Sequence, residues 1–148
     1  MKKLKLISIL SLLFVLNVPS MCSDDDDTST QVSNPTEIAS TLADGQWIVT
    51  LYKENDVVQT SNYSGYNFTF GADGALSATN GSTTQSGDWS TYTDSGYTKL
   101  DMMFTALDGP FEEISEDWRV ISRTTTKIEL KHISGGDGST DYLTFEKD

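Results

Sequence analysis

The sequence predicts an all-β domain, an antiparallel up-and-down barrel of about eight strands preceded by a short helix. After residue 45, short segments alternate apolar and polar side chains, which is the period of a half-buried strand. Gly, Asp and Asn residues separate these segments at short intervals, as they do in hairpins. Eight antiparallel strands can close on themselves and remove both exposed sheet edges. A two-sheet β-sandwich is the alternative, because strand spacing alone does not separate the two architectures.

A short helix is predicted at the start of this domain, over residues 37–43. Thr36 is a residue type that caps helices, and Glu37 lies in the first turn, where negative charge is favourable. Ile38 and Leu42 are four residues apart and therefore share one apolar face.

Eight strands are predicted after the helix. The clearest is residues 66–70, in which Tyr66, Phe68 and Phe70 alternate with two polar residues. Asp73-Gly74 then favours a tight turn into the next strand. The expected strands span residues 46–52, 66–70, 75–79, 87–93, 99–104, 118–123, 127–132 and 141–146.

Two connections are longer than a hairpin turn requires. Residues 53–65 contain a Val-Val pair, which favours an extra short strand. Residues 105–117 contain Pro110, which suits the first position of a helical turn. Phe111 and Ile114 would then project on one side, and we expect them to plug one end of the barrel.

The first residues of the chain predict an export signal. Three lysines precede an apolar run from Leu6 to Leu16, which is the pattern of a secretory signal. This run has roughly 11 residues, about half of what a membrane-spanning helix needs. We therefore expect residues 1–21 to be a signal peptide.

Cys22 is the only cysteine and follows the apolar run by a few residues. A lone thiol cannot form an intramolecular disulfide, and an exported chain rarely keeps a free thiol without a use. We predict that Cys22 is the lipidated N-terminus of the mature protein. Cleavage after Ser20 without lipidation is the alternative, since residues 18–20 resemble a general cleavage site.

Cys22, Ser23 and the four aspartates at residues 24–27 resemble the start of mature lipoproteins of the Bacteroidota. In that group, an acidic run after the lipidated cysteine marks export to the cell surface. Residues 19–21 depart from the usual lipobox, in which Leu, Ala or Gly is common. The resemblance implies a protein that is anchored in the outer membrane through Cys22 and faces the cell surface.

The polar composition of residues 22–35 predicts a flexible linker, followed by a single domain at residues 36–148. The chain carries 10 basic and 22 acidic residues, and loss of the signal with its three lysines changes the net charge from −12 to −15. Such a chain has no basic footprint for nucleic acid. Anionic lipid head groups would also repel it, so we expect membrane contact through the anchor alone.

Gly45-Gln46-Trp47, at the head of the first predicted strand, resembles the G-x-W signature of lipocalins. The resemblance implies a calycin barrel with room for a small ligand. It also implies that Trp47 packs across the closed barrel end under a late-strand arginine, Arg119 or Arg123. Three further motifs resemble the lipocalin-like lipoproteins of the Bacteroidota: Phe68-x-Phe70 before Asp73-Gly74, Gly87-x-Trp89, and Leu143-x-Phe145.

Two functions are predicted for this domain. The leading hypothesis is a non-enzymatic lipocalin-like protein that binds a small apolar ligand inside the barrel. The alternative is a protein-binding accessory or inhibitor module of a cell-surface complex, with a packed core and exposed aromatic residues on residues 53–65 and 105–117. The residues expected in the interior, as core first and ligand contacts second, are Trp47, Phe68, Phe70, Trp89, Met102, Phe104, Trp118, Leu130, His132 and Phe145.

The sequence contains few residues that could form a catalytic or metal site. His132 is the only histidine, no G-x-S-x-G motif is present, and the strand phase places His132 inward near a strand end. One histidine and no free thiol leave only carboxylates as further zinc ligands, so we expect no metal and no cofactor. An acidic cluster is more typical of a solvated loop than of a glycosidase pair. Its members are Glu112, Glu113, Glu116 and Asp117.

Overall fold

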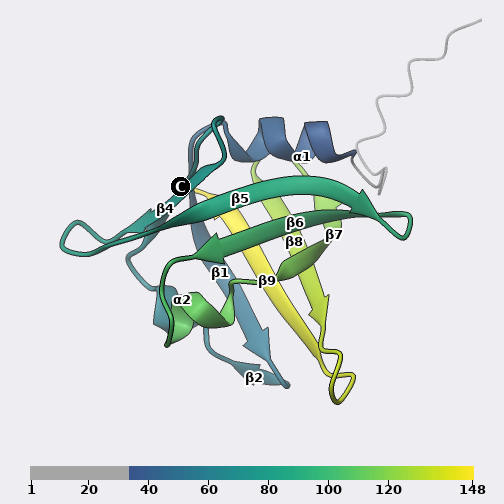
Figure 1. The fold of residues 1–148 in the computed structure, drawn as a ribbon. Helices are drawn as coiled ribbons and strands as arrows, with labels where there is room; N and C mark the ends of the chain where they lie inside the picture. Colours follow the sequence, from purple (N-terminus) through teal and green to yellow (C-terminus); the bar gives the residue numbers. More distant parts are fainter. Residues whose placement is uncertain (1–33) are drawn as a thin grey trace, which may run out of the picture.

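The computed structural model describes residues 34–148, which form one closed antiparallel barrel (Figure 1). Residues 1–33, with the predicted signal and Cys22 anchor, lie outside the described residues. The elements are α1 (Pro35–Leu42), β1 (Gln46–Glu54), β2 (Val57–Val58), the 3-10 helix η1 (Thr60–Tyr63), β3 (Asn67–Phe70), β4 (Ala75–Thr79), β5 (Thr84–Asp94), β6 (Tyr97–Phe104), α2 (Pro110–Glu113), β7 (Asp117–Arg123), β8 (Lys127–Ile133) and β9 (Thr140–Lys147).

The barrel closes through pairing between its first and last long strands. From β3 to β9 each strand pairs with the next, and β1 pairs with β3 and, from Trp47 to Lys53, with β9. The short β2 adds to the far end of β1, as expected for the Val-Val pair. The prediction of an eight-stranded antiparallel barrel is therefore confirmed, and the described residues do not form a sandwich.

Side chains alternate across the barrel wall with the period of two. In β6, burial falls on every second residue, Thr98, Leu100, Met102 and Phe104, while the residues between them are partly or fully exposed. Because the wall curves around a single axis, the inward side chains of all the long strands meet in one hydrophobic core.

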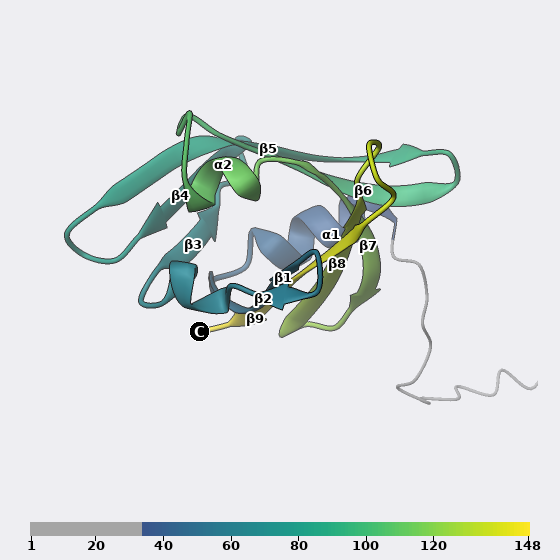
Figure 2. The same cartoon turned by 90° about the horizontal axis from the view of Figure 1, so that it is seen from below.

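Helix α1 lies against the end of the barrel at which β1 begins; in Figure 2, seen from below, α1 lies behind the strands. Its cap is Asn34 rather than Thr36, because the Asn34 side chain accepts a hydrogen bond from the Glu37 N–H at 3.0 Å. Pro35 takes the first helical position, where its missing N–H costs nothing. The helix therefore begins two residues before the predicted start.

Trp47 is fully buried at the α1 end of the barrel, with Ile38 and Leu42 of α1 in the same core. Its Nε1 donates a hydrogen bond to the Leu42 carbonyl oxygen at 2.9 Å. The cation over its ring is Lys147, whose Nζ lies 5.7 Å from the ring centroid. Arg119, one of the two expected partners, lies over a different aromatic ring on the outer face.

The opposite end of β1 is covered by η1 and α2. The Tyr63 hydroxyl donates to the Pro110 carbonyl oxygen at 2.6 Å, and the rings of Tyr63 and Phe111 pack edge to face. Phe111 and Ile114 are buried, as the predicted plug requires. Within residues 34–148, no helix is both long enough and apolar enough to cross a membrane.

Candidate functional site

The barrel interior is filled by the side chains that the sequence places there. The Phe68 ring lies 5.1 Å from Phe145, 6.2 Å from Phe104 and 6.1 Å from Phe111, measured between centroids. These spacings are those of aromatic rings in direct contact, so no small molecule separates them. The buried members of the predicted set are Trp47, Phe68, Phe70, Trp89, Met102, Phe104, Trp118, Leu130 and Phe145.

The protein-binding hypothesis expected exposed aromatic residues on the two long connections, yet the aromatic residues there lie inward. Tyr63 is buried, and Phe111 is buried as the predicted plug. These rings plug the barrel end, which leaves only aliphatic large side chains, such as Val57, Val58 and Leu107, exposed on these segments. The predicted exposed aromatic patch is therefore wrong for these segments.

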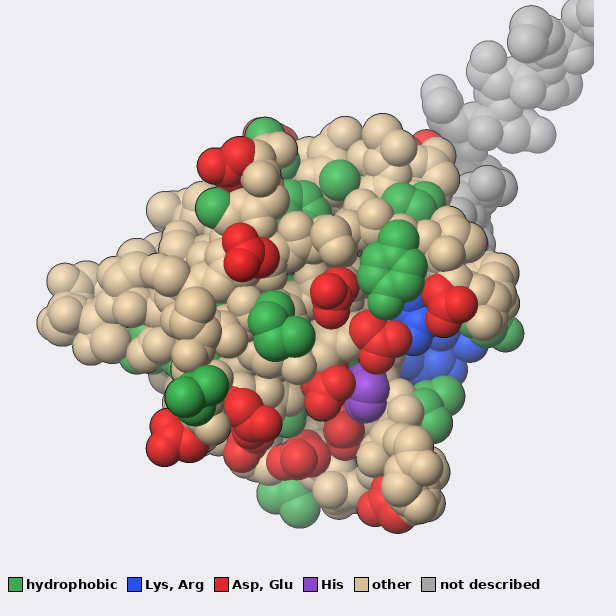
Figure 3. Space-filling view, viewed as in Figure 1, with side chains coloured by type: hydrophobic (Ala, Val, Ile, Leu, Met, Phe, Trp, Pro, Cys, Tyr) green, Lys and Arg blue, Asp and Glu red, His purple; other side chains and the backbone are tan. Residues whose placement is uncertain are grey.

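His132 is the one predicted interior residue that does not join the core. It lies near the end of β8 and lines a hollow of about 240 Å³ at the η1 and α2 end of the barrel. We call this feature the acidic hollow, because six of its lining side chains are carboxylates and none is Lys or Arg. Figure 3 shows acidic side chains gathered around the histidine on this face. The lining residues are Glu54, Asn55, Glu112, Glu113, Glu116, Trp118, His132, Ser134, Asp137, Ser139 and Asp141.

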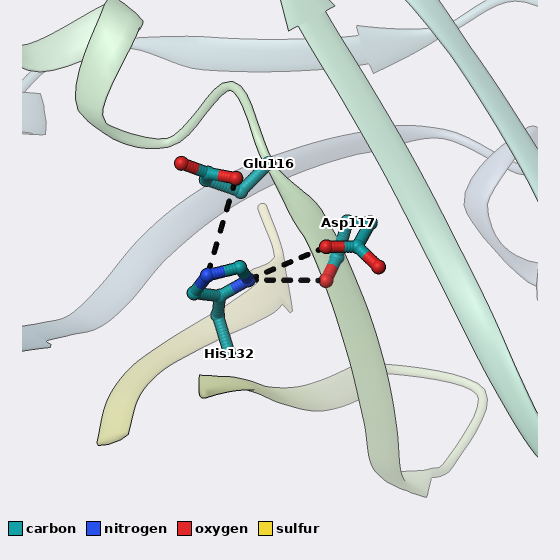
Figure 4. A group of neighbouring side chains, drawn as sticks. All are labelled: Glu116, Asp117 and His132. Carbon is teal, nitrogen blue, oxygen red and sulfur yellow. Dashed lines mark hydrogen bonds and ion pairs between the residues drawn. The ribbon is translucent and has the colours of Figure 1, made fainter. Parts of the chain in front are cut away.

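The His132 imidazole lies between Glu116 and Asp117 (Figure 4). Its Nδ1 is 3.3 Å from the Asp117 carbonyl oxygen and 3.5 Å from Asp117 Oδ1. Its Nε2 is 4.0 Å from Glu116 Oε2. Two acceptors at Nδ1 favour the tautomer in which Nδ1 carries the proton, and this leaves the Nε2 lone pair on the side of Glu116.

Glu113 brings a second unusual group to the acidic hollow. Its Oε2 atom has no accessible surface and no hydrogen-bond partner. Burial raises the pKa of the Glu113 carboxyl, and the negative charges of Glu54 and Glu112 raise it further. A buried carboxylate oxygen without a donor costs folding free energy.

A second charged feature lies on the outer face of the same strands. Lys99 of β6 is directly opposite Arg119 of β7, and Arg119 is directly opposite Lys131 of β8. We call these three residues the cationic row; they are three of the seven basic residues in the described part of the chain. Like charges opposite one another destabilise a sheet, and the ion pair of Lys99 with Asp117 at 2.8 Å offsets part of this cost.

Aromatic side chains flank the cationic row. The Arg119 guanidinium lies 3.2 Å from the Tyr97 ring centroid, and Tyr142 of β9 is directly opposite Lys131. A surface hollow of about 300 Å³ runs along the row, with the partly exposed Tyr97 and the exposed Ile133 in its lining. In Figure 3, the Lys and Arg side chains on this face gather beside the acidic ones.

The two charged features meet at Asp117. Its Oδ2 accepts from Lys99 Nζ at 2.8 Å, and its other carboxylate oxygen faces His132. The sequence showed the acidic residues of the long connection but did not indicate that His132, fifteen or more residues away, lies among them. The sequence places the three residues of the cationic row on the outward faces of three strands. It does not give the strand register that brings them side by side.

Comparison with known proteins supports the fold. A solved structure of a DUF4847 family protein from Bacteroides vulgatus matches with a TM-score of 0.51 and 16% sequence identity. The match covers 75% of this chain and 97% of the other chain. No protein-family model matches the sequence, and no curated protein is similar to it. At this identity the likeness concerns the barrel fold alone.

Proposed function

We propose that this chain is an exported lipoprotein, anchored in the outer membrane through Cys22, whose lipocalin-like barrel is a non-enzymatic binding module at the cell surface. The lysines and apolar run before Cys22 support export, and the acidic run after it supports display at the surface. The Bacteroides structural neighbour is consistent with this setting through its fold.

The module binds its partner on the outside of the barrel. The observation that carries this choice is the filled interior, in which Phe68 alone packs against four other rings, those of Tyr63, Phe104, Phe111 and Phe145. An apolar ligand would have to displace contacts among core side chains, each of which contributes to stability. The packed-core alternative therefore fits the geometry better than a ligand in the interior.

The cationic row with its flanking tyrosines is the surface best suited to a protein partner. Arg and Tyr are enriched at protein interfaces, and the row adds Ile133 as an exposed apolar side chain. Three adjacent cations are complementary to an acidic segment of another protein. Binding of such a segment would also offset the repulsion between Arg119 and Lys131, whereas Lys99 already pairs with Asp117.

The test is capture of the partner from the native host with the anchored protein and a row variant. Arg119→Gln combined with Lys131→Gln should lower the amount of captured protein by about tenfold or more, because both charges and the stacked guanidinium are lost. Lys127→Gln is the matched control, since Lys127 also faces outward on β8 but pairs with Glu129. Native mass spectrometry of the eluted complex identifies what is bound.

Three results would contradict this proposal. They are a small molecule bound in place of a protein, no captured protein, and equal capture by the row variant and the control. The anchor is tested separately by Cys22→Ala, which should release the protein from the membrane fraction. Unchanged membrane retention of that variant would contradict lipidation without bearing on the row.

A further inference from the structure

We propose that the acidic hollow is a binding site for a divalent first-row transition metal such as Zn²⁺, with His132 Nε2 and the Glu116 carboxylate as ligands. The proposed ligand atoms are not part of the cationic row, although Asp117 and His132 also border the hollow beside that row. It follows from the geometry of the imidazole, from the distance between the two ligand atoms and from the acidic lining of the hollow.

The imidazole is held in the orientation that metal-binding histidines have. The Nδ1–H faces the Asp117 carbonyl and carboxylate oxygens at 3.3 and 3.5 Å. Histidines that bind metals almost always donate their second ring N–H to a carboxylate or carbonyl, which fixes the tautomer and makes the other nitrogen a stronger ligand. Asp117 is therefore a positioning residue, and His132 presents its Nε2 lone pair to the acidic hollow.

The ligand atoms are separated by a distance that a metal can bridge. Bonds of ~2.1 Å to an imidazole nitrogen and ~2.0 Å to a carboxylate oxygen span at most about 4.1 Å. His132 Nε2 and Glu116 Oε2 are 4.0 Å apart. A tetrahedral metal needs these atoms about 3.3 Å apart, and the half-exposed Glu116 side chain can approach by that amount.

The charge of the lining also favours a cation in the acidic hollow. The possible ligand atoms of Glu116, Asp117 and His132 all lie within 4.8 Å of one another. A cation here would partly neutralise a lining that has six carboxylates and no basic residue.

The mixed ligand set favours transition metals over Mg²⁺ and Ca²⁺. Imidazole nitrogen suits Zn²⁺, Cu²⁺ and Ni²⁺, whereas Mg²⁺ and Ca²⁺ prefer oxygen alone. Solvent has access to the hollow, so water can complete the coordination of a metal bound by His132 and Glu116.

The experiment is titration of the full, untagged, metal-free chain with ZnCl₂, followed by calorimetry and by ¹⁵N NMR of the imidazole. Because His132 is the only histidine, its two ring nitrogen signals need no assignment to a residue. We expect Zn²⁺ to shift the Nε2 signal strongly and to leave Nδ1 protonated. Excess Ca²⁺ should not reproduce the shift.

Four variants distinguish coordination of the metal by particular residues from nonspecific attraction of Zn²⁺ to the acidic lining. His132→Gln and Glu116→Gln should each weaken Zn²⁺ binding by at least tenfold, and Asp117→Asn by about 10- to 100-fold because the imidazole loses its carboxylate partner. Glu112→Gln is the matched control, since Glu112 lines the same hollow but takes no part in the proposed set. Circular dichroism of each variant checks that the barrel is intact.

Three results would overturn the metal site. They are no binding of Zn²⁺, equal binding by the His132→Gln variant and the unmodified chain, and equal losses in Glu112→Gln and Glu116→Gln. None of these results bears on partner capture, because the Zn²⁺ titration contains no partner protein and Arg119 and Lys131 are unchanged in all four variants. Asp117→Asn does remove the ion-pair partner of Lys99 in the cationic row.

Discussion

The barrel interior and the acidic hollow adjoin each other at Trp118, but they differ in whether their buried polar groups have partners. In the interior, rings contact rings, and the buried Trp47 indole N–H has a carbonyl partner. In the acidic hollow, a buried carboxylate oxygen has no partner and like charges face one another. The difference indicates that the interior is arranged for stability, whereas the hollow retains unfavourable charge, as functional sites commonly do.

The largest expected effect comes from emptying the interior. Phe68→Ala should lower the free energy of unfolding by about 3–5 kcal/mol, because it removes a ring that packs against four others and leaves a cavity. Urea unfolding followed by tryptophan fluorescence measures the loss. Leu107→Ala is the control, since Leu107 is 93% exposed. A loss below about 1 kcal/mol would mean a loosely packed interior and would favour the small-ligand hypothesis.

The next effect comes from adding an atom to the barrel wall. A Cβ on Gly87 would lie against the Met103 carbonyl oxygen and within 2.7 Å of the Phe104 Cα, both backbone atoms that cannot turn away. Gly87→Ala should therefore lower the free energy of unfolding by about 2–3 kcal/mol. Gly135→Ala, where the added Cβ meets no atom within 4 Å, should leave the thermal midpoint nearly unchanged. Equal midpoints for both variants would show that β5 and β6 can separate freely.

A smaller effect is expected at the boundary between the two regions. Trp118 Nε1 donates to the Ile114 carbonyl oxygen at 3.0 Å, and the Trp118 ring lies edge to face with His132. Trp118→Phe keeps an aromatic ring and removes one of the two hydrogen bonds to that carbonyl, which also accepts from the Glu116 N–H at 3.0 Å, so it should cost about 1 kcal/mol in urea unfolding. The His132 imidazole signals should shift in the same variant. Unshifted imidazole signals would mean that the interior does not orient the hollow.

The smallest expected effect is a gain in stability rather than a loss. The pKa of Glu113 is raised in the folded protein by burial and by Glu54, so the folded state holds its proton more tightly than the unfolded state does. The unmodified chain therefore loses stability as pH rises above the usual range of a glutamate. Glu113→Gln should raise the thermal midpoint of the metal-free protein at pH 7, and the gain should vanish near pH 4. A lower midpoint at pH 7 would show that the carboxylate stabilises the fold.

Much of the fold was predictable because each strand carries its own pattern. Phe68 and Phe70 alternate with polar residues whatever the strand pairs with, so residues 66–70 were correctly assigned without any tertiary information. The helix start was wrong by two residues because Asn34 and Thr36 are both good caps, and only the hydrogen bond to the Glu37 N–H shows which one is used.

The candidate sites were predictable only in part, because they depend on register and on packing between distant segments. His132 was correctly placed near a strand end facing inward, but its position opposite Asp141 and beside Asp117 comes from the pairing of β7, β8 and β9. The protein-binding hypothesis expected exposed aromatic residues on the long connections, but Tyr63 is buried beside Phe111, the ring predicted to plug the barrel end, because burial of an apolar ring is favourable.

The sequence by itself determined the all-β class, the number of long strands, the aromatic core and the positions of the two long connections. Local alternation and turn residues act within a few positions of the chain, so they are visible without a structure. The tertiary structure alone decided that β1 meets β9, that Lys99, Arg119 and Lys131 align in a row, and that the acidic connection folds over His132. Closure and register place residues side by side that are far apart in the chain, and no local pattern records which strands will pair.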